Sequence, residues 1–244
     1  MRQKRICCPQ LSEATRYAAA YLRDLGFEVT SEPDTDAAHL LLPVPSFPAV
    51  DSALEHILNG LSKDTLISGG NLEGQLDGFR TVDFLKDPYY LAENAAITAR
   101  CAAEIVQNQL GTSLSGCPVL VLGWGRIGKC LCRLFETAGV DVAAAARKDS
   151  DRAMIQALGS RSISIEDAAL ELMHYRVILN TVPEMVLPNM VTKPDCVILE
   201  LASRPGMSGG NIIDSRRLPG RMAPAASGEL IAKTFIRLSL GKEV

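Results

Sequence analysis

The sequence predicts an α/β protein with two doubly wound parallel-sheet domains joined by a long helix, the second domain being a Rossmann dinucleotide-binding domain. Three observations predict this fold. Short apolar runs alternate with helix-like segments in both halves, a long helical pattern separates the halves, and a glycine-rich turn opens the second half. With 244 residues, the chain is long enough for two domains with separate cores.

The expected domains follow from the positions of these patterns. We expect a flavodoxin-like, substrate-side α/β domain, a linker helix, a Rossmann NAD(P)-binding domain, and a C-terminal helix that packs back on the first domain. Their predicted ranges are, in that order, residues 1–88, 89–115, 116–222 and 223–244.

Composition narrows the class of protein. The chain is 47% apolar and 22% charged, as in folded globular proteins, and its net charge of −3 offers no general attraction to nucleic acid or to an anionic membrane. An anionic ligand therefore needs local positive groups. The seven cysteines lack C-x-x-C spacing and the first ten residues are too polar for a signal peptide, so we expect a cytoplasmic protein. Cys130 and Cys132 would point in different directions on a helix, and no metal site is expected.

The first domain reads as alternating strands and helices. Strands are predicted at residues 4–8, 27–30, 39–45, 65–70 and 79–85, and helices at residues 12–25 and 51–60. Pro43, Pro45 and Pro48 crowd the end of the third run and cannot donate ladder hydrogen bonds. They mark a loop at the carboxyl edge of the sheet, where parallel sheets bind ligands.

The apolar positions of residues 87–110 recur at helical spacing over about five turns, which predicts the linker helix. Glycines and a proline in residues 111–118 then end it. In the second domain we predict strands at residues 119–123, 140–146, 162–165, 176–183 and 196–203, and helices from the glycine turn to 138, at 149–158 and at 166–174. A terminal amphipathic helix is predicted at residues 223–240.

The turn Gly123-Trp124-Gly125-Arg126-Ile127-Gly128 follows a buried strand and opens a helix, the context that a dinucleotide-binding G-x-G-x-x-G motif requires. The first glycine allows the tight turn, the second lets the backbone approach a pyrophosphate, and the third lets the helix pack closely. All six residues are candidate cofactor ligands. Arg126 could instead meet the substrate or project into water.

The acidic residue that binds the ribose 2′-hydroxyl in NAD-selective motifs is missing after the second strand, where Arg147 and Lys148 stand instead. A guanidinium cannot accept a hydrogen bond, but it can grip a 2′-phosphate. The sequence thus favours NADP(H), with NAD possible. The alternative is that Arg147 is only a solvated surface cation.

Two further strand ends bring polar groups to the same edge. Asn180-Thr181-Val182-Pro183 ends the fourth strand of the domain and is expected beside the nicotinamide ribose. Glu200, Ser203 and Arg204, in "ELASRPG", end the next strand and are the candidate catalytic residues.

The segments "VLGWGRIGK", "AARKDS", "ILNTVPEMVL", "LELASRPG" and "LPGRMAPAASGELIA" resemble those of the dipicolinate synthase A-subunit family, in the same order, over about residues 89–240. The resemblance implies NAD(P)-dependent oxidation of dihydrodipicolinate to dipicolinate, a pyridine dicarboxylate stored in bacterial spores. It also implies a partner, the flavoprotein-like second subunit of dipicolinate synthase. The sequence resembles a divergent member, because it departs from the family pattern at residues 98–101 and 225–228.

Aromatising a dihydropyridine requires loss of a hydride to the cofactor and of a proton. Two substrate carboxylates call for cations, and Arg204, Arg221 and Arg100 are the candidates. The base could be Glu200, although a carboxylate inside a hydrophobic strand could instead only orient a neighbouring group. Alternatively, water could take the proton. The histidines, His39, His56 and His174, fall away from the predicted carboxyl edge or within helices.

Two other functions compete with this one. The chain could be another two-domain NAD(P)-dependent dehydrogenase acting on a small carboxylate, although such enzymes usually carry a recognisable base. It could also be a module that senses NADP(H) without turnover, which fits the absence of an obvious base but leaves "ASRPG" and "LPGRMAP" unexplained. The sequence leaves the oligomeric state open, including a homo-oligomer.

Overall fold

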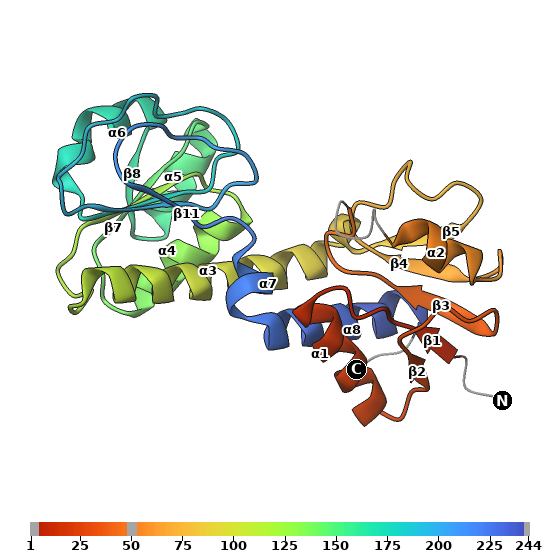
Figure 1. The fold of residues 1–244 in the computed structure, drawn as a ribbon. Helices are drawn as coiled ribbons and strands as arrows, with labels where there is room; N and C mark the ends of the chain where they lie inside the picture. Colours follow the sequence, from red (N-terminus) through yellow and green to blue (C-terminus); the bar gives the residue numbers. More distant parts are fainter. Residues whose placement is uncertain (1–4, 48–52, 242–244) are drawn as a thin grey trace. The chain divides into compact units, whose positions relative to one another are not determined.

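The computed structural model describes residues 5–47 and 53–241. The chain divides into two compact units, called here the first unit (Met1–Asn94 with Pro219–Val244) and the second unit (Ala95–Leu218). Each unit is built on its own parallel sheet with flanking helices (Figure 1). The predicted fold class, two doubly wound α/β sheets, is confirmed.

The sheet of the first unit has five parallel strands in the order β2-β1-β3-β4-β5, which is the flavodoxin order. Its central strands are almost fully buried, as expected for a parallel sheet covered on both faces. The strands are β1 (Arg5–Cys7), β2 (Val29–Thr30), β3 (Ala37–Leu41), β4 (Leu66–Gly69) and β5 (Arg80–Asp83), and the short helices are α2 (Leu54–Asn59) and η1 (Phe84–Lys86).

Helices α1 (Glu13–Asp24) and α8 (Pro224–Ser239) lie side by side in the first unit, although they come from opposite ends of the chain (Figure 1). Ser12 caps α1 through a reciprocal pair of hydrogen bonds with Thr15. Gly228 permits the close approach, because a Cβ there would lie 2.5 Å from the carbonyl oxygen of Ala14. Phe235 is fully buried in the shared core.

The long helix α3 (Pro88–Leu110) is continuous, and Asp87 caps its first turn. The Asp87 carboxylate accepts a hydrogen bond from the backbone N–H of Tyr90 at 2.7 Å and one from Arg237 of α8 at 2.6 Å. Burial raises the pKa of Asp87, but the hydrogen bonds from Arg237 and Tyr90 outweigh it and the net pKa is lowered. Asp87 therefore joins the start of α3 to α8.

The second unit has the Rossmann arrangement. Its six parallel strands are ordered β11-β10-β9-β6-β7-β8, which is the 3-2-1-4-5-6 pattern read from the other side. The strands are β6 (Val119–Leu122), β7 (Val142–Ala145), β8 (Arg161–Ile163), β9 (Val177–Asn180), β10 (Val197–Glu200) and β11 (Ile212–Asp214). The helices are α4 (Arg126–Thr137), α5 (Asp149–Ala157), α6 (Ile165–Glu171), η2 (Leu172–His174) and α7 (Leu218–Met222), the last of which crosses into the first unit.

Several predicted boundaries were wrong. The third strand ends at Leu41, before Pro43, and starts earlier than predicted; Pro48 lies outside the described residues. Ser164 does not extend β8, because its side chain caps α6 by accepting a hydrogen bond from Asp167. The short strand β11 and the helix α7 were not predicted, since three and five residues carry no readable period.

Within residues 5–47 and 53–241, no helix combines the length and the hydropathy needed to cross a bilayer. Five cysteines, Cys7, Cys8, Cys101, Cys132 and Cys196, are buried. Burial raises the pKa of Cys132 to about 12, so its thiol is neutral at physiological pH.

We predict that Asp87→Asn lowers the free energy of unfolding by about 1 kcal/mol at about pH 7, because asparagine keeps the cap but loses the charge beside Arg237. Asp87→Ala should cost about 1 kcal/mol more, since it also removes the cap. Because the folded-state pKa of Asp87 is lowered, its charge stabilises the fold above about pH 4 and stops doing so as the pH falls through the folded-state pKa.

Urea unfolding at about pH 7 and about pH 3 measures both effects. The wild-type advantage over Asp87→Asn should shrink at the lower pH. Equal stabilities for the asparagine and alanine variants would contradict the capping role.

Candidate functional site

A cavity of about 340 Å³ lies at the carboxyl edge of the second sheet, where the strand order reverses between β6 and β9. It brings together three segments that are far apart in the sequence: the glycine turn after β6, the loop after β7 and the loop after β9. Its lining residues are Gly123, Trp124, Gly125, Ala146, Arg147, Lys148, Asp151, Ile165, Thr181, Val182, Pro183 and Glu184.

The three glycines of the turn occupy three different environments. Gly123 has a φ of 99°, a left-handed conformation that favours glycine, and a Cβ there would lie 2.5 Å from Thr181 Oγ1. Gly128 packs against the turn so closely that a Cβ would overlap the carbonyl of Gly123. Gly125 is open, with nothing within 4 Å of a Cβ position. The turn is thus closely packed at Gly123 and Gly128 and accessible at Gly125.

Gly125 is also the N-cap of α4, and among the described residues no side chain forms a capping hydrogen bond at this end of the helix. The first turn of α4 carries no acidic residue. The backbone N–H groups and the positive end of the helix dipole can therefore receive an anion from the cavity. Arg126 and Ile127 follow in this turn but do not line the cavity, and Arg126 is exposed.

The loop after β9 is locked against β6. Thr181 donates hydrogen bonds to the carbonyl of Leu122 from its backbone N–H at 2.9 Å and from Oγ1 at 2.8 Å. The segment Asn180–Pro183, predicted as part of the site, thus forms one wall of the cavity through Thr181, Val182 and Pro183. Asn180 itself is fully buried behind this wall.

A buried carboxylate holds the loops after β9 and β10 in place. Glu200, only 4% exposed, accepts hydrogen bonds from Asn180 Nδ2 at 2.8 Å, from the backbone N–H of Ala202 at 3.0 Å and from that of Gly206 at 2.8 Å. Asn180 in turn accepts a hydrogen bond from the backbone N–H of Val182 at 3.0 Å. Asn180 and Glu200 are thus the inner support of the cavity wall.

These contacts bear on the candidate catalytic residues. Both carboxylate oxygens of Glu200 accept hydrogen bonds from loop groups, which favours the orienting role over that of a base. Ser203 and Arg204 are exposed on the loop that Glu200 shapes, and they do not line the cavity. Glu200 is therefore better described as a positioning residue.

Arg147 meets a carboxylate that sequence reasoning missed. Its Nη2 lies 2.7 Å from Oε2 of Glu184, in the loop after β9, and both side chains are more than half exposed. The hydrogen bond and charge of Arg147 lower the pKa of Glu184, and the charge of Arg204 adds to this. Glu184 directly follows the predicted site segment, which ends at Pro183. This adjacency is the one sequence signal that could have pointed to Glu184.

The loop that carries Arg147 is itself supported. Arg152 donates hydrogen bonds to the carbonyls of Ala146 at 2.9 Å and of Arg147 at 2.8 Å. Lys148 is exposed and is the N-cap of α5. Two cations, Arg147 and Lys148, therefore line the cavity next to backbone carbonyls that Arg152 holds.

The remaining predicted residues lie elsewhere. Arg100 is exposed on α3 and Arg221 is exposed on α7 in the first unit; neither lines the cavity at the glycine turn. His39 is buried on β3, whereas His56 and His174 are exposed on α2 and η2. No histidine is among the lining residues of this cavity.

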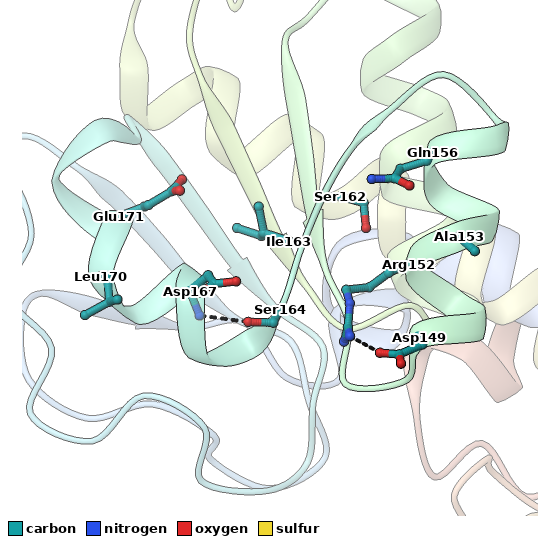
Figure 2. A pocket seen from close by; sticks show the side chains of 10 residues that line it. All are labelled: Asp149, Arg152, Ala153, Gln156, Ser162, Ile163, Ser164, Asp167, Leu170 and Glu171. Atoms are coloured by element: carbon teal, nitrogen blue, oxygen red, sulfur yellow. Dashed lines mark hydrogen bonds and ion pairs between the residues drawn. The ribbon is translucent and has the colours of Figure 1, made fainter.

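A second hollow on the same unit, of about 490 Å³, lies between α5 and α6 (Figure 2). Arg152 points toward Asp149 there and pairs with it, as the dashed line in Figure 2 shows. Asp149, Asp167 and Glu171 give the hollow three carboxylates against the single guanidinium of Arg152. Its charge makes it a poor site for a phosphate, unlike the cavity at the glycine turn.

For the part of the chain that the structure describes, no group of three or more histidine, cysteine or acidic side chains is arranged to hold a metal ion.

Comparison with known proteins shows what the chain is similar to. No family model matches it. It is 30% identical over 137 residues to the A subunit of dipicolinate synthase from Bacillus subtilis (strain 168), over 52% of this chain and 46% of that protein. The match thus spans about half the length of this relative.

Solved structures extend the similarity to both units. The A subunit of dipicolinate synthase from Bacillus halodurans matches with a TM-score of 0.83 at 20% identity, over 97% of each chain, and that from Bacillus subtilis with 0.78 at 19%, over 99% of this chain and 97% of the other. The chain has the fold of the dipicolinate synthase A subunit. A transhydrogenase from Sinorhizobium meliloti matches with a TM-score of 0.66 at 13% identity, over 96% and 92% of the two chains.

The resemblance to the dipicolinate synthase A subunit is therefore confirmed in sequence and in fold. Four of the segments that carry it end strands at the carboxyl edge of the second sheet: "VLGWGRIGK" ends β6, "AARKDS" ends β7, "ILNTVPEMVL" ends β9 and "LELASRPG" ends β10. The departure at residues 225–228 falls on α8, where Ser227 and Gly228 are buried and Gly228 packs on α1.

We predict that Gly206→Ala lowers the free energy of unfolding by about 1–3 kcal/mol and weakens the binding of any ligand in the cavity. A Cβ at Gly206 would overlap Asn180 Nδ2 and the carbonyl of Val182, and would lie 2.7 Å from that of Glu184, so the cavity wall would have to shift. Thermal unfolding measures the loss.

Gly220→Ala is the matched control, because a Cβ there meets nothing within 4 Å and alanine favours its helix. An unchanged melting temperature for Gly206→Ala would contradict the role of Asn180 and Glu200 as the inner support of the cavity wall.

Proposed function

We propose that the chain is an NADP(H)-dependent oxidoreductase of the dipicolinate synthase A-subunit type, which oxidises dihydrodipicolinate to dipicolinate. The observation that supports this proposal most directly is a single cavity. It combines the open Gly125, the uncapped start of α4 and the cations Arg147 and Lys148. The similarity to the dipicolinate synthase A subunit and to a transhydrogenase supports an oxidoreductase that uses a nicotinamide cofactor.

The residues of the cavity fit such a cofactor. The backbone at Gly125 and the first turn of α4 would hold the pyrophosphate, which is the anion that this geometry suits. Arg147 and Lys148 would hold the 2′-phosphate, and NAD would also fit, without that contact. Thr181, Val182 and Pro183 would lie beside the nicotinamide ribose.

A nicotinamide cofactor bound here would supply the hydride acceptor for oxidation of the dihydropyridine. The protein must hold the two substrate carboxylates and let one proton leave. Arg204 is the first candidate cation, because it lies on the loop that Glu200 positions and its charge helps to lower the pKa of Glu184 at the cavity, and Ser203 beside it can donate a hydrogen bond. Arg221 and Arg100 stay further candidates for substrate binding. Glu200 positions the loop that carries Ser203 and Arg204, and water would take the proton.

The wider setting follows from the same similarity. The relative is named as one subunit of a synthase, which supports a partner subunit for this chain, and we propose that this partner is the flavoprotein-like second subunit. We propose that residues 1–88 form the substrate-side domain, 89–115 the linker helix and 116–222 the cofactor domain, with 223–244 completing the first. We also propose action in the cytoplasm during sporulation.

A module that senses NADP(H) without turnover is the second candidate. The observation in its favour is that the Glu200 carboxylate is saturated with hydrogen bonds and no histidine lines the cavity. Such a module would bind the cofactor as the enzyme does, so only turnover separates the two.

We predict that Arg147→Ala weakens NADPH binding roughly 10- to 100-fold, as expected for loss of a charge-assisted hydrogen bond to the 2′-phosphate, and changes NADH binding less than about threefold. Trp124 is the single tryptophan and lines the cavity, so its fluorescence reports binding directly. Arg161→Ala is the control, because Arg161 pairs with Glu171 at the start of β8, at the other edge of the sheet. Equal losses for NADPH and NADH would remove the case for 2′-phosphate recognition.

We predict that the chain forms NADPH from NADP⁺ and dihydrodipicolinate, and that dipicolinate accumulates in equal amount. Absorbance and chromatography, with and without a candidate flavoprotein-like partner, measure the two products. Cofactor binding with no turnover in either mixture would favour the sensing module. Turnover with another small carboxylate alone would favour a different dehydrogenase.

A further inference from the structure

We propose that Glu184 limits the preference for NADP(H) over NAD(H) by competing for Arg147. This inference rests on the proposed function and concerns the same cavity. In NAD-selective proteins, an acidic residue after the second strand of the domain binds the ribose 2′-hydroxyl. Here the corresponding carboxylate would come from Glu184, in the loop after β9.

The two side chains belong to two different loops that line one cavity. Arg147 comes from the loop after β7 and Glu184 from the loop after β9, and both are lining residues. Their side chains meet at 2.7 Å, Nη2 to Oε2. The guanidinium that would receive a 2′-phosphate is therefore already engaged by a carboxylate.

The two cofactors differ in what they offer this pair. A 2′-phosphate is an acceptor with about two negative charges, so it has to share or displace Glu184 at Arg147 and is repelled by it. A ribose 2′-hydroxyl can instead donate a hydrogen bond to Glu184. Glu184 thus opposes one cofactor and assists the other.

The ionisation of Glu184 suits this role. Arg147 lowers the pKa of Glu184 by hydrogen bond and charge, with a further contribution from Arg204, so the carboxylate is charged at neutral pH. Other charges act in the same place: Lys148 and Asp151 also line the cavity, with opposite signs. Glu184 differs from Asp151 because its carboxylate contacts Arg147 directly.

The backbone around Glu184 is held independently of its side chain. The backbone N–H of Val186 donates to the carbonyl of Gly206 at 2.8 Å, and Thr181 fixes the other end of the segment to β6. Substituting the Glu184 side chain should therefore leave the cavity wall in place. The side chains of Arg147 and Glu184 are 63% and 59% exposed, so their pair is weak and a ligand can displace it.

The test is Glu184→Gln, which keeps the shape and removes the charge. We expect NADPH to bind roughly 3- to 10-fold more tightly, because an exposed competing charge is lost, and NADH to bind equally or up to about threefold more weakly. Trp124 fluorescence titrations of the full chain with NADPH and NADH give both constants. The ratio of the two constants thus moves toward NADPH.

Two further variants sharpen the result. Glu171→Gln is the matched control, since Glu171 pairs with Arg161 at 2.6 Å outside this cavity, and it should leave the ratio unchanged. In the Arg147→Ala background, Glu184→Gln should change NADPH binding by less than it does with Arg147 present, because the competition needs both partners.

A ratio that stays constant in Glu184→Gln, or moves toward NADH, overturns the inference. If the wild-type chain binds both cofactors and only this ratio fails to move, the proposed function stands and the role of Glu184 falls. If the wild-type chain binds neither cofactor, both fall.

Discussion

The buried carboxylate of Glu200 is the constraint on which the cavity depends. A carboxylate that is 4% exposed must be satisfied by donors, and here the donors are Asn180 and the backbone N–H groups of Ala202 and Gly206. Satisfying one buried carboxylate thereby fixes two loops from neighbouring strands. Its hydrogen bonds fix the shape of the cavity, so an acidic residue inside an apolar strand supports the cavity wall without lining the cavity.

The second constraint is the glycine turn, which packs against the loop after β9. Gly123 is pressed against Thr181 and Gly128 against the turn itself, while Gly125 faces open space at the uncapped end of α4. A helix end with unsatisfied N–H groups beside an open backbone favours a phosphate-bearing ligand. The charges on Arg147, Lys148 and Glu184 line the same cavity, and we propose that they set the preference between the two ribose forms.

Most of this architecture was readable in the sequence, because alternation of short apolar runs and helical periods is a strong signal. The glycine turn and the segment ending at Pro183 were correctly placed at one edge, since parallel strands share a carboxyl edge. The partner of Arg147 could not be read, because Glu184 reaches it across two loops distant in sequence. An orienting role for Glu200 could be expected from its place in an apolar strand, but its hydrogen-bond donors could not be read, because they depend on tertiary packing. Strand β11 was too short to carry a pattern.

The most direct measurement is a crystal structure of the chain with NADPH bound. The account predicts the pyrophosphate against the backbone at Gly125 and the first turn of α4, with the 2′-phosphate within hydrogen-bond distance of the Arg147 guanidinium. A cofactor bound elsewhere, or a 2′-phosphate turned into solvent away from Arg147, would contradict it.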